Sequence, residues 1–190
     1  SEAIRSVYED PALEKLYNEN KAVLKDVYTR YTKEDVSFCP AGLGFGQLKS
    51  KSKERLNYLT VLTRPQEIMY KQMRCSDEDR KMRKELKCTG DERFSDVLQK
   101  YVPKYLKQMK ASDVDRKDID GLAFGVYWPV RDVCDTYGGF VEYVIIYFAR
   151  HDARDLLEGS LAFEEAIQNA EIVTSLDEKP AASVKPVFKK

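Results

Sequence analysis

The chain has 190 residues, of which 43% are apolar and 11% aromatic, and this composition is sufficient for one sizeable hydrophobic core. Charged residues make up 34% of the chain, but the aromatic content excludes an intrinsically disordered protein. No stretch reaches the ~18 consecutive apolar residues that a membrane-spanning helix needs, so we expect a soluble protein. We expect one domain over residues 1–175 and a mobile tail over residues 176–190, where Pro, Ala and Lys follow no period.

Charge is segregated along the chain although the formal net charge is zero. Residues 47–110 contain 17 Lys and Arg against 9 Asp and Glu, whereas residues 111–175 contain 5 against 13. A basic region can attract an anionic partner, or the two regions can neutralise each other within one fold. The basic residues at 77–87 are interleaved with acidic ones, and the pI near 6.6 is low for a nucleic-acid-binding domain. A nucleic-acid partner is therefore not expected.

Residues 11–34 are predicted to form one long helix. Asp10 is a suitable N-cap, and Pro11 suits the first helical position. Residues then recur at steps of three and four, with one polar interruption: Leu13, Tyr17, Asn20, Leu24, Val27 and Tyr31. This heptad pattern predicts a helix that packs on the chain's own sheet, or one that forms a homodimer through its seam.

Two β-like runs follow at residues 37–45 and 56–62, and Pro65 ends the second run. Three helical pieces are predicted next, at residues 66–74, 77–87 and 92–109. Ser76 is the expected N-cap of the middle piece. Pro103 should kink or divide the last piece, because proline removes a helical hydrogen bond.

The strongest local signal is a β-hairpin. Residues 122–128 and 140–148 are rich in aromatic and β-branched side chains, and two glycines lie in the connection between them. Trp128 shares one face of the first run with three other apolar residues, so we expect its ring to be buried. Both faces of the second run are largely apolar, which predicts a central strand that is covered on both sides.

Two short helices, at residues 152–158 and 161–169, and a strand at residues 171–174 complete the predicted elements. Short connections between neighbouring strands favour an antiparallel or mixed sheet. The predicted fold is therefore α+β, with the long N-terminal helix and several further helices packed on that sheet.

The four cysteines form no CxxC motif, which excludes zinc-ribbon and thioredoxin-like sites. A full-length helix over residues 77–87 would hold its ends ~16 Å apart, so a bridge between Cys75 and Cys88 is not expected. Cys39 and Cys134 lie in or beside strand-like segments, and we expect them to approach bridging distance. The first residue is Ser1, which fits removal of a signal peptide and fits a trimmed chain equally well. An extracytoplasmic location is favoured over a cytoplasmic one.

Three features that could carry chemistry have the wrong spacing or composition. The glycine-rich residues 42–46 match neither a dinucleotide fingerprint nor a phosphate-binding loop, so a bend or bulge is expected. The acidic residues at 113–120 break the calcium-loop register, because its first and twelfth positions fall on Arg116 and Tyr127. His151 is the only histidine, which excludes multi-histidine metal sites. No catalytic residue, cofactor or metal is assigned.

The candidate ligand-binding residues all belong to the hairpin: Trp128, Tyr127, Glu142 and Tyr143. Glu142 lies among apolar neighbours, where an ionised carboxylate needs a partner. It could act as an acid–base group, pair with an arginine such as Arg131 or Arg150, or face solvent at the start of the strand.

We expect a non-enzymatic binding or sensing domain, with an apolar, aromatic-rich surface near the hairpin that contacts a small apolar ligand or a protein. The absence of a catalytic set favours this function, and so do the 12 Tyr, 8 Phe and 1 Trp. Two alternatives remain open. One is an enzyme that uses carboxylate and tyrosine acid–base chemistry around Glu142, and the other is an interaction or dimerisation module that uses the N-terminal heptad helix. No motif identifies a known family.

Overall fold

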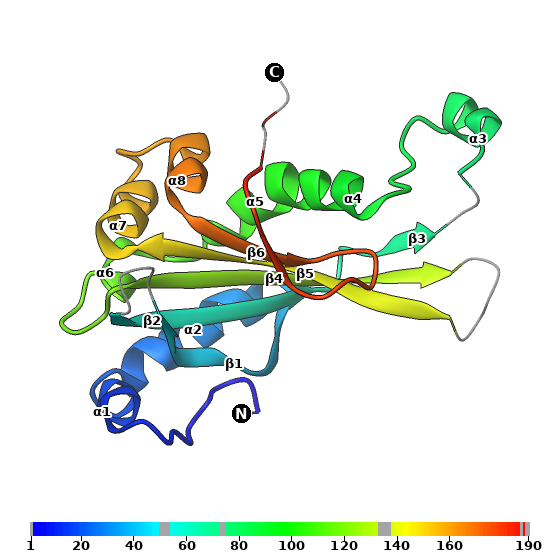
Figure 1. Cartoon of the computed structure of the whole chain (residues 1–190). Coiled ribbons are helices and arrows are strands. Elements are labelled where there is room, and N and C mark those ends of the chain that lie inside the picture. Colours follow the sequence, from blue (N-terminus) through cyan, green and yellow to red (C-terminus); the bar gives the residue numbers. More distant parts are fainter. Residues whose placement is uncertain (1, 50–53, 73–74, 133–137, 187, 189–190) are drawn as a thin grey trace.

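The computed structural model describes residues 2–49, 54–72, 75–132, 138–186 and 188 (Figure 1). Its framework is a mixed sheet, to which the described residues contribute seven strands. These are β1 Val36–Lys49, β2 Arg55–Pro65, β3 Tyr70–Gln72, β4 Gly121–Asp132, β5 Gly139–Ala149, β6 Glu171–Ser175 and β7 Ala182–Val184. Helices pack on this sheet, so the predicted α+β class is confirmed.

The strands follow the order β1-β2-β4-β5-β6-β7, and β3 also pairs with β4. Neighbouring strands are antiparallel except that β2 and β3 both run parallel to β4. A parallel pair needs a long crossover connection. Here the helical residues between β3 and β4 provide it, and they return the chain to the edge of β2.

The long N-terminal helix was wrongly predicted, because the chain forms two helices that meet at Asn20: α1 Pro11–Glu19 and α2 Lys21–Lys33. The buried Asn20 side chain donates from Nδ2 to the Leu16 carbonyl, and its Oδ1 accepts from Arg116 Nε at 2.6 Å. The polar interruption of the heptad pattern is thus a hydrogen-bonded corner. Asp10 caps α1 as predicted, accepting from the backbone of Ala12 and Leu13.

The apolar seam of these two helices is buried inside the chain's own fold. Leu24, Val27 and Tyr31 are all 0% exposed. The Tyr31 ring packs edge-on against Phe38 of β1, and its hydroxyl donates to the Tyr105 carbonyl at 2.7 Å. The alternative in which the seam packs on the chain's own sheet therefore agrees with the structure.

The remaining helices are α3 Asp77–Met82, α4 Gly90–Asp96, the π-helical η1 Val97–Tyr101, α5 Val102–Leu106, α6 Ala111–Val114, α7 Arg150–Glu158 and α8 Phe163–Asn169. Ser76 caps α3 as predicted, with a reciprocal capping box to Asp79. The predicted helix at 66–74 is wrong, since β3 occupies Tyr70–Gln72 and residues 73–74 lie outside the described part of the chain.

The predicted helix at 92–109 is divided near Pro103, as expected. The π turn of η1 directly precedes α5, in which Pro103 occupies one of the first two positions. A proline is tolerated there because the first helical N–H groups have no partner in the helix. The piece begins earlier than predicted, at Gly90, and Thr89 is its N-cap.

The predicted hairpin is confirmed and is longer than expected. Its strands pair from Gly121↔Ala149 to Arg131↔Gly139, and residues 133–137 of the connection lie outside the described residues. β5 lies between β4 and β6, so its central position is confirmed. Trp128 is 0% exposed, as predicted.

The prediction that β5 is covered on both faces is wrong. Phe38 lies opposite Thr63, and Thr63 lies opposite Val126, so all three share the face of Trp128, which we call the core face. α2 contacts this face through Tyr31 and α4 contacts it through Arg93, and Figure 1 shows α4, α5, α7 and α8 together above the sheet. The other face, which we call the open face, is partly exposed at these residues: Tyr127, Tyr143, Ile145 and Tyr147.

The C-terminal elements largely follow the pattern in the sequence. α7 ends at Gly159, whose φ of 85° is a left-handed helix cap, and β6 covers the predicted strand. α8 begins at Phe163, later than predicted, and Ala162 is its N-cap. Part of the segment predicted as a tail forms β7. The structure contains no described helix long and apolar enough to cross a membrane.

Candidate functional site

The structure separates the four candidate ligand-binding residues into two pairs on opposite faces of the hairpin. Trp128 lies opposite Glu142 in the register, and both point into the core. Tyr127 lies opposite Tyr143 on the open face, where their stacked rings have centroids 4.8 Å apart. The four residues therefore do not form one site.

Glu142 is the centre of a buried polar cluster, which we call the Glu142 cluster and which contains Glu142, Arg93, Trp128 and Asp177. The Glu142 carboxylate is 0% exposed and accepts four hydrogen bonds. Arg93 donates from Nε to Oε1 at 2.6 Å and from Nη2 to Oε2 at 3.1 Å. Trp128 Nε1 donates to Oε1 at 3.0 Å, and the Asp177 backbone N–H donates to Oε2 at 2.7 Å. Both carboxylate oxygens are thus held by neighbours within the protein.

The partner of Glu142 was not found from the sequence. Arg131 and Arg150 were the suggested partners, but both are exposed, and buried Arg93 of α4 makes the ion pair. A signal for Arg93 does exist, because it precedes the buried Val97 by one helical turn and so falls on the apolar stripe of the helix. A buried arginine in such a position needs an acidic partner.

Asp177 connects the C-terminal segment to this cluster. Its Oδ1 accepts from Arg93 Nη2 at 2.8 Å, and both of its carboxylate oxygens lie 3.0 Å from the Gly90 backbone nitrogen. A Cβ at position 90 would lie 2.7 Å from the Asp177 carboxylate, so this approach requires glycine. The segment that was predicted as a tail is therefore fastened to α4 at this residue.

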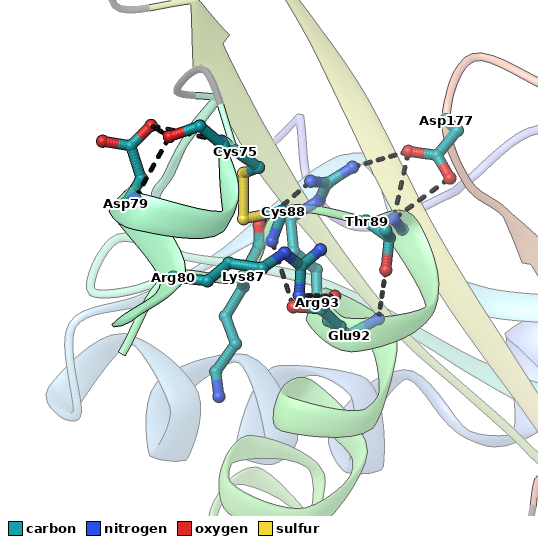
Figure 2. Close-up of a disulfide and its surroundings, with 11 residues drawn as sticks. Cys75, Asp79, Arg80, Lys87, Cys88, Thr89, Glu92, Arg93 and Asp177 are labelled. Carbon is teal, nitrogen blue, oxygen red and sulfur yellow. Dashed lines mark hydrogen bonds and ion pairs between the residues drawn. A yellow bond between two sulfur atoms is a disulfide. The ribbon is translucent and has the colours of Figure 1, made fainter. Parts of the chain in front are cut away.

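A disulfide joins Cys75 and Cys88 beside the cluster (Figure 2), with an S–S distance of 1.99 Å and a Cα–Cα distance of 6.0 Å. The prediction that these two cysteines do not bridge is wrong. Its premise was a helix that continues to residue 87, whereas α3 ends at Met82 and the chain turns back toward α4. Next to the bridge, the Lys87 carbonyl accepts from Arg93 Nη1 at 3.2 Å, and Cys88 N–H donates to Glu92.

Cys39 is a free thiol on β1, and its expected partner, Cys134, lies outside the described residues. Burial raises the pKa of the Cys39 thiol to about 11, although the nearby Arg64 guanidinium lowers it. Burial likewise raises the pKa of Tyr127 to about 12, and the nearby Cys39 adds to the rise. These three residues are thus electrostatic neighbours near the end of β2.

The sheet opens into a groove at this place. β2 pairs with β4 as far as Thr63↔Val126, and β3 pairs with β4 only from Tyr70↔Val130 onward. Residues 127–129 of β4 therefore lack a strand partner on that side among the described residues. The opening has a volume of about 400 Å³, and we call it the β2–β3 groove. Its apolar lining comes from Phe38, Ile68, Met69, Tyr127, Pro129 and Val141.

Two of the predicted ligand-binding residues border this groove, in different ways. Tyr127 reaches it from the open face, whereas the Trp128 ring borders it from within the core and is itself 0% exposed. Tyr143 and Glu142 do not line it. A larger cavity of about 520 Å³ lies between α4 and the C-terminal segment, but it adjoins residues that the structure does not describe.

The glycine-rich and acidic segments, whose spacing does not match a phosphate-binding or calcium-binding motif, have structural roles. The glycine-rich residues 42–46 lie in β1, beside a register shift between Phe38 and Leu43, as expected for a bulge. The Asp113 carboxylate is buried and pairs with Arg30 at 2.8 Å. His151 is exposed beside Asp152. Within the described ranges, no group of three His, Cys, Asp or Glu side chains could hold a metal ion.

Comparison with known proteins gives no match: no family model fits the chain, and no curated protein or solved structure is significantly similar to it.

Proposed function

We propose that this chain is a non-enzymatic binding domain that holds a ligand with an apolar body in the β2–β3 groove. The observation that carries the proposal is the groove itself, with a volume of about 400 Å³ and walls of aromatic and aliphatic side chains. This volume lies within the range of roughly 300–1,000 Å³ that is usual for small-molecule pockets.

Two of the four large apolar side chains that are exposed in the described chain line the groove. The large hydrophobic residues that are most exposed in the described chain are Val7, Met69, Met82 and Val141. Met69, which is 52% exposed, and Val141, which is 50% exposed, line the same groove although 72 positions separate them in the sequence. Contiguous exposed apolar surface of this kind is typical of a binding site.

The polar groups of the site support binding rather than catalysis. The described residues that line the groove include no carboxylate and no histidine. Glu142, on which the enzyme alternative depends, is enclosed by four donors and does not line the groove. The dimerisation alternative has less support, since the seam residues Leu13, Leu24, Val27 and Tyr31 are buried within the fold.

The Cys75–Cys88 disulfide supports an extracytoplasmic location for this binding function. Disulfides persist in oxidising compartments and are rare in the cytosol, where thiols are kept reduced. A domain of this kind would meet its ligand outside the cytoplasm.

The test is a titration with N-phenylnaphthylamine, a neutral apolar probe whose fluorescence rises on leaving water. We expect the protein to bind it, and we expect Met69→Asp and Val141→Asp each to weaken binding about tenfold or more, because a buried carboxylate opposes an apolar ligand. Met82→Asp and Val7→Asp are matched controls at exposed positions that do not line the groove, and they should change binding less than about twofold. Failure of the wild-type protein to bind the probe would contradict the proposed function.

A further inference from the structure

The β2–β3 groove carries positive charge that no acidic residue balances within its described lining. Arg64 and Arg131 are the charged residues of the lining, and both side chains are exposed. Among the described residues, no ion pair joins either guanidinium to a carboxylate. Arg30 and Arg93 differ from them, because each pairs with a buried acidic residue. Arg5, Arg116 and Arg150 make no ion pair among the described residues either, but they donate to backbone carbonyls or to the Asn20 side chain.

The two arginines lie on the same face of the sheet as Tyr127 and Pro129. Tyr127, Pro129 and Arg131 alternate along β4, so their side chains share the open face. Arg64 directly follows Thr63, the last β2 residue paired to β4, and so lies next to Tyr127 on that face. Four residues of strand separate Tyr127 from Arg131, or about 13 Å at ~3.3 Å per residue. An apolar strip therefore runs between two guanidinium groups.

We propose, on the basis of the binding function above, that the ligand of this groove is a small amphiphile with an anionic head group, such as a carboxylate or a phosphate. The head group would accept charge-assisted hydrogen bonds from Arg64 or Arg131 while the apolar body lies against Tyr127 and Met69. Arginine suits this role because its planar fork matches carboxylate and phosphate oxygens.

The groove favours a small molecule over a protein segment or a free anion. Its volume of about 400 Å³ is that of a small-ligand pocket. A simple anion would leave the apolar walls in water. An amphiphile covers both parts of the site.

The experiment compares two probes with similar apolar bodies. Anilinonaphthalene sulfonate carries a negative charge, and N-phenylnaphthylamine lacks it. We expect Arg64→Gln and Arg131→Gln each to weaken binding of the sulfonate about three- to fivefold, and the double variant about tenfold or more. The affinity for the neutral probe should change by less than about twofold in all three variants. Arg55→Gln is the matched control, because Arg55 is an exposed arginine at the opposite end of the same strand.

Competition distinguishes the possible sources of the anion. Decanoate and decyl phosphate should displace the bound sulfonate probe, whereas acetate and inorganic phosphate at the same concentration should not. Raising the salt concentration from about 50 to about 500 mM should weaken binding of the sulfonate probe, because salt screens exposed charge pairs. Binding of the neutral probe should not change.

Each outcome has a distinct meaning. If both probes bind but the arginine variants affect neither, or affect both equally, the anionic ligand is refuted and the apolar binding function stands. Displacement by acetate or inorganic phosphate alone would replace the amphiphile with a simple anion. If the neutral probe does not bind the wild-type protein, the proposed function fails and this inference fails with it.

Discussion

Glu142 is the residue at which α4, the hairpin and the C-terminal segment converge. Glu142→Gln keeps the shape of the side chain but removes the buried one of the two carboxylates that pair with Arg93, since Asp177 is partly exposed. Breaking one partner of a buried ion pair typically costs about 3–5 kcal/mol, so we expect a loss of stability in that range. Denaturant unfolding measures it, with Glu9→Gln as an exposed control that should shift stability by less than about 0.5 kcal/mol.

A double variant separates the ion pair from simple packing. The Arg93→Met/Glu142→Leu variant removes both charges of the pair. We expect it to lose less stability than the sum of the losses of Arg93→Met and Glu142→Leu, because neither charge is left buried alone. Stability changes that simply add would show that the two side chains act independently. A Glu142→Gln variant as stable as the wild type would contradict the cluster as described.

Cys39 provides a pH-dependent prediction at the same scale. Its pKa is raised to about 11 by burial, so the neutral thiol is the form that the fold favours. This contribution to stability is complete below the unfolded-state pKa of 9.0 and is lost as pH rises through about 11. In a Cys134→Ser background, alkylation by iodoacetamide should be slow at about pH 8 and should rise until about pH 11, because the thiolate is the reactive form.

The Cys39 prediction has an internal control. Since Arg64 lowers the pKa of Cys39, Arg64→Gln should move the alkylation midpoint to higher pH. Urea-unfolded protein should show an ordinary thiol midpoint near 9.0. A folded protein whose midpoint equals the unfolded one would place Cys39 in solvent.

Individual residues could be predicted where they follow a local pattern. Trp128 lies on a regular alternation, and the burial it predicts is confirmed. The partner of Glu142 depends on which helix crosses the hairpin, and no local period contains that information. Arg93 and Asp177 lie 49 and 35 positions away from Glu142, and the two arginines considered instead were simply those nearest the hairpin in sequence.

At the scale of elements, the disulfide closes the segment 75–88, which contains α3 and has little packing of its own. None of the residues of α3 is buried, and Figure 1 shows α3 apart from the rest of the molecule. The bridge closes a loop with a sequence separation of 13. We expect the Cys75→Ser/Cys88→Ser variant to lose about 3 kcal/mol by the chain-entropy estimate for a loop of this length.

The measurement is denaturant unfolding with and without reductant. Dithiothreitol should destabilise the wild-type protein by the same amount and should leave the double variant unchanged. A double variant that matches the oxidised wild type would show that the segment 75–88 unfolds separately from the rest of the fold.

The strands could be predicted more completely than the helices. Alternation and β-branched content define β2, β4, β5 and β6 within a few residues. The helices failed where a single residue has a tertiary role, as Asn20 does by accepting a hydrogen bond from Arg116 across 96 positions. β3 was missed because its three residues form a strand only by pairing with β4, which carries no local signal.

At the scale of the whole molecule, α2 and α4 contact the core face of the sheet. The open face is partly exposed. The groove exists because β2 and β3 pair with the same edge of β4 at different positions along the strand, and a gap remains between them. Such a gap depends on strand register, which the sequence does not reveal. The sequence analysis therefore predicted Tyr127 and Trp128 as ligand-binding residues but did not predict the gap between β2 and β3 beside them. Met69, Arg64 and the exposed position of Val141 were missed for the same reason.

The buried position of Trp128 makes the only tryptophan a reporter on the groove. We expect a blue-shifted emission that resists quenching by acrylamide, because the ring is 0% exposed. Trp128→Ala should cost about 3–5 kcal/mol, the usual range for truncating a large aromatic side chain in a core. A red-shifted, readily quenched emission would contradict the packing of the hairpin.

The central claim, that the β2–β3 groove binds an anionic amphiphile, is tested most directly by contact quenching of Trp128. A terminally brominated undecanoate carries a heavy atom that quenches tryptophan only at short range, and plain undecanoate is the matched control. We predict that the brominated acid quenches Trp128 in a saturable way, that plain undecanoate competes with it, and that Arg64→Gln/Arg131→Gln weakens the effect about tenfold. Unquenched Trp128 emission in protein saturated with the brominated acid would place binding elsewhere and contradict the account.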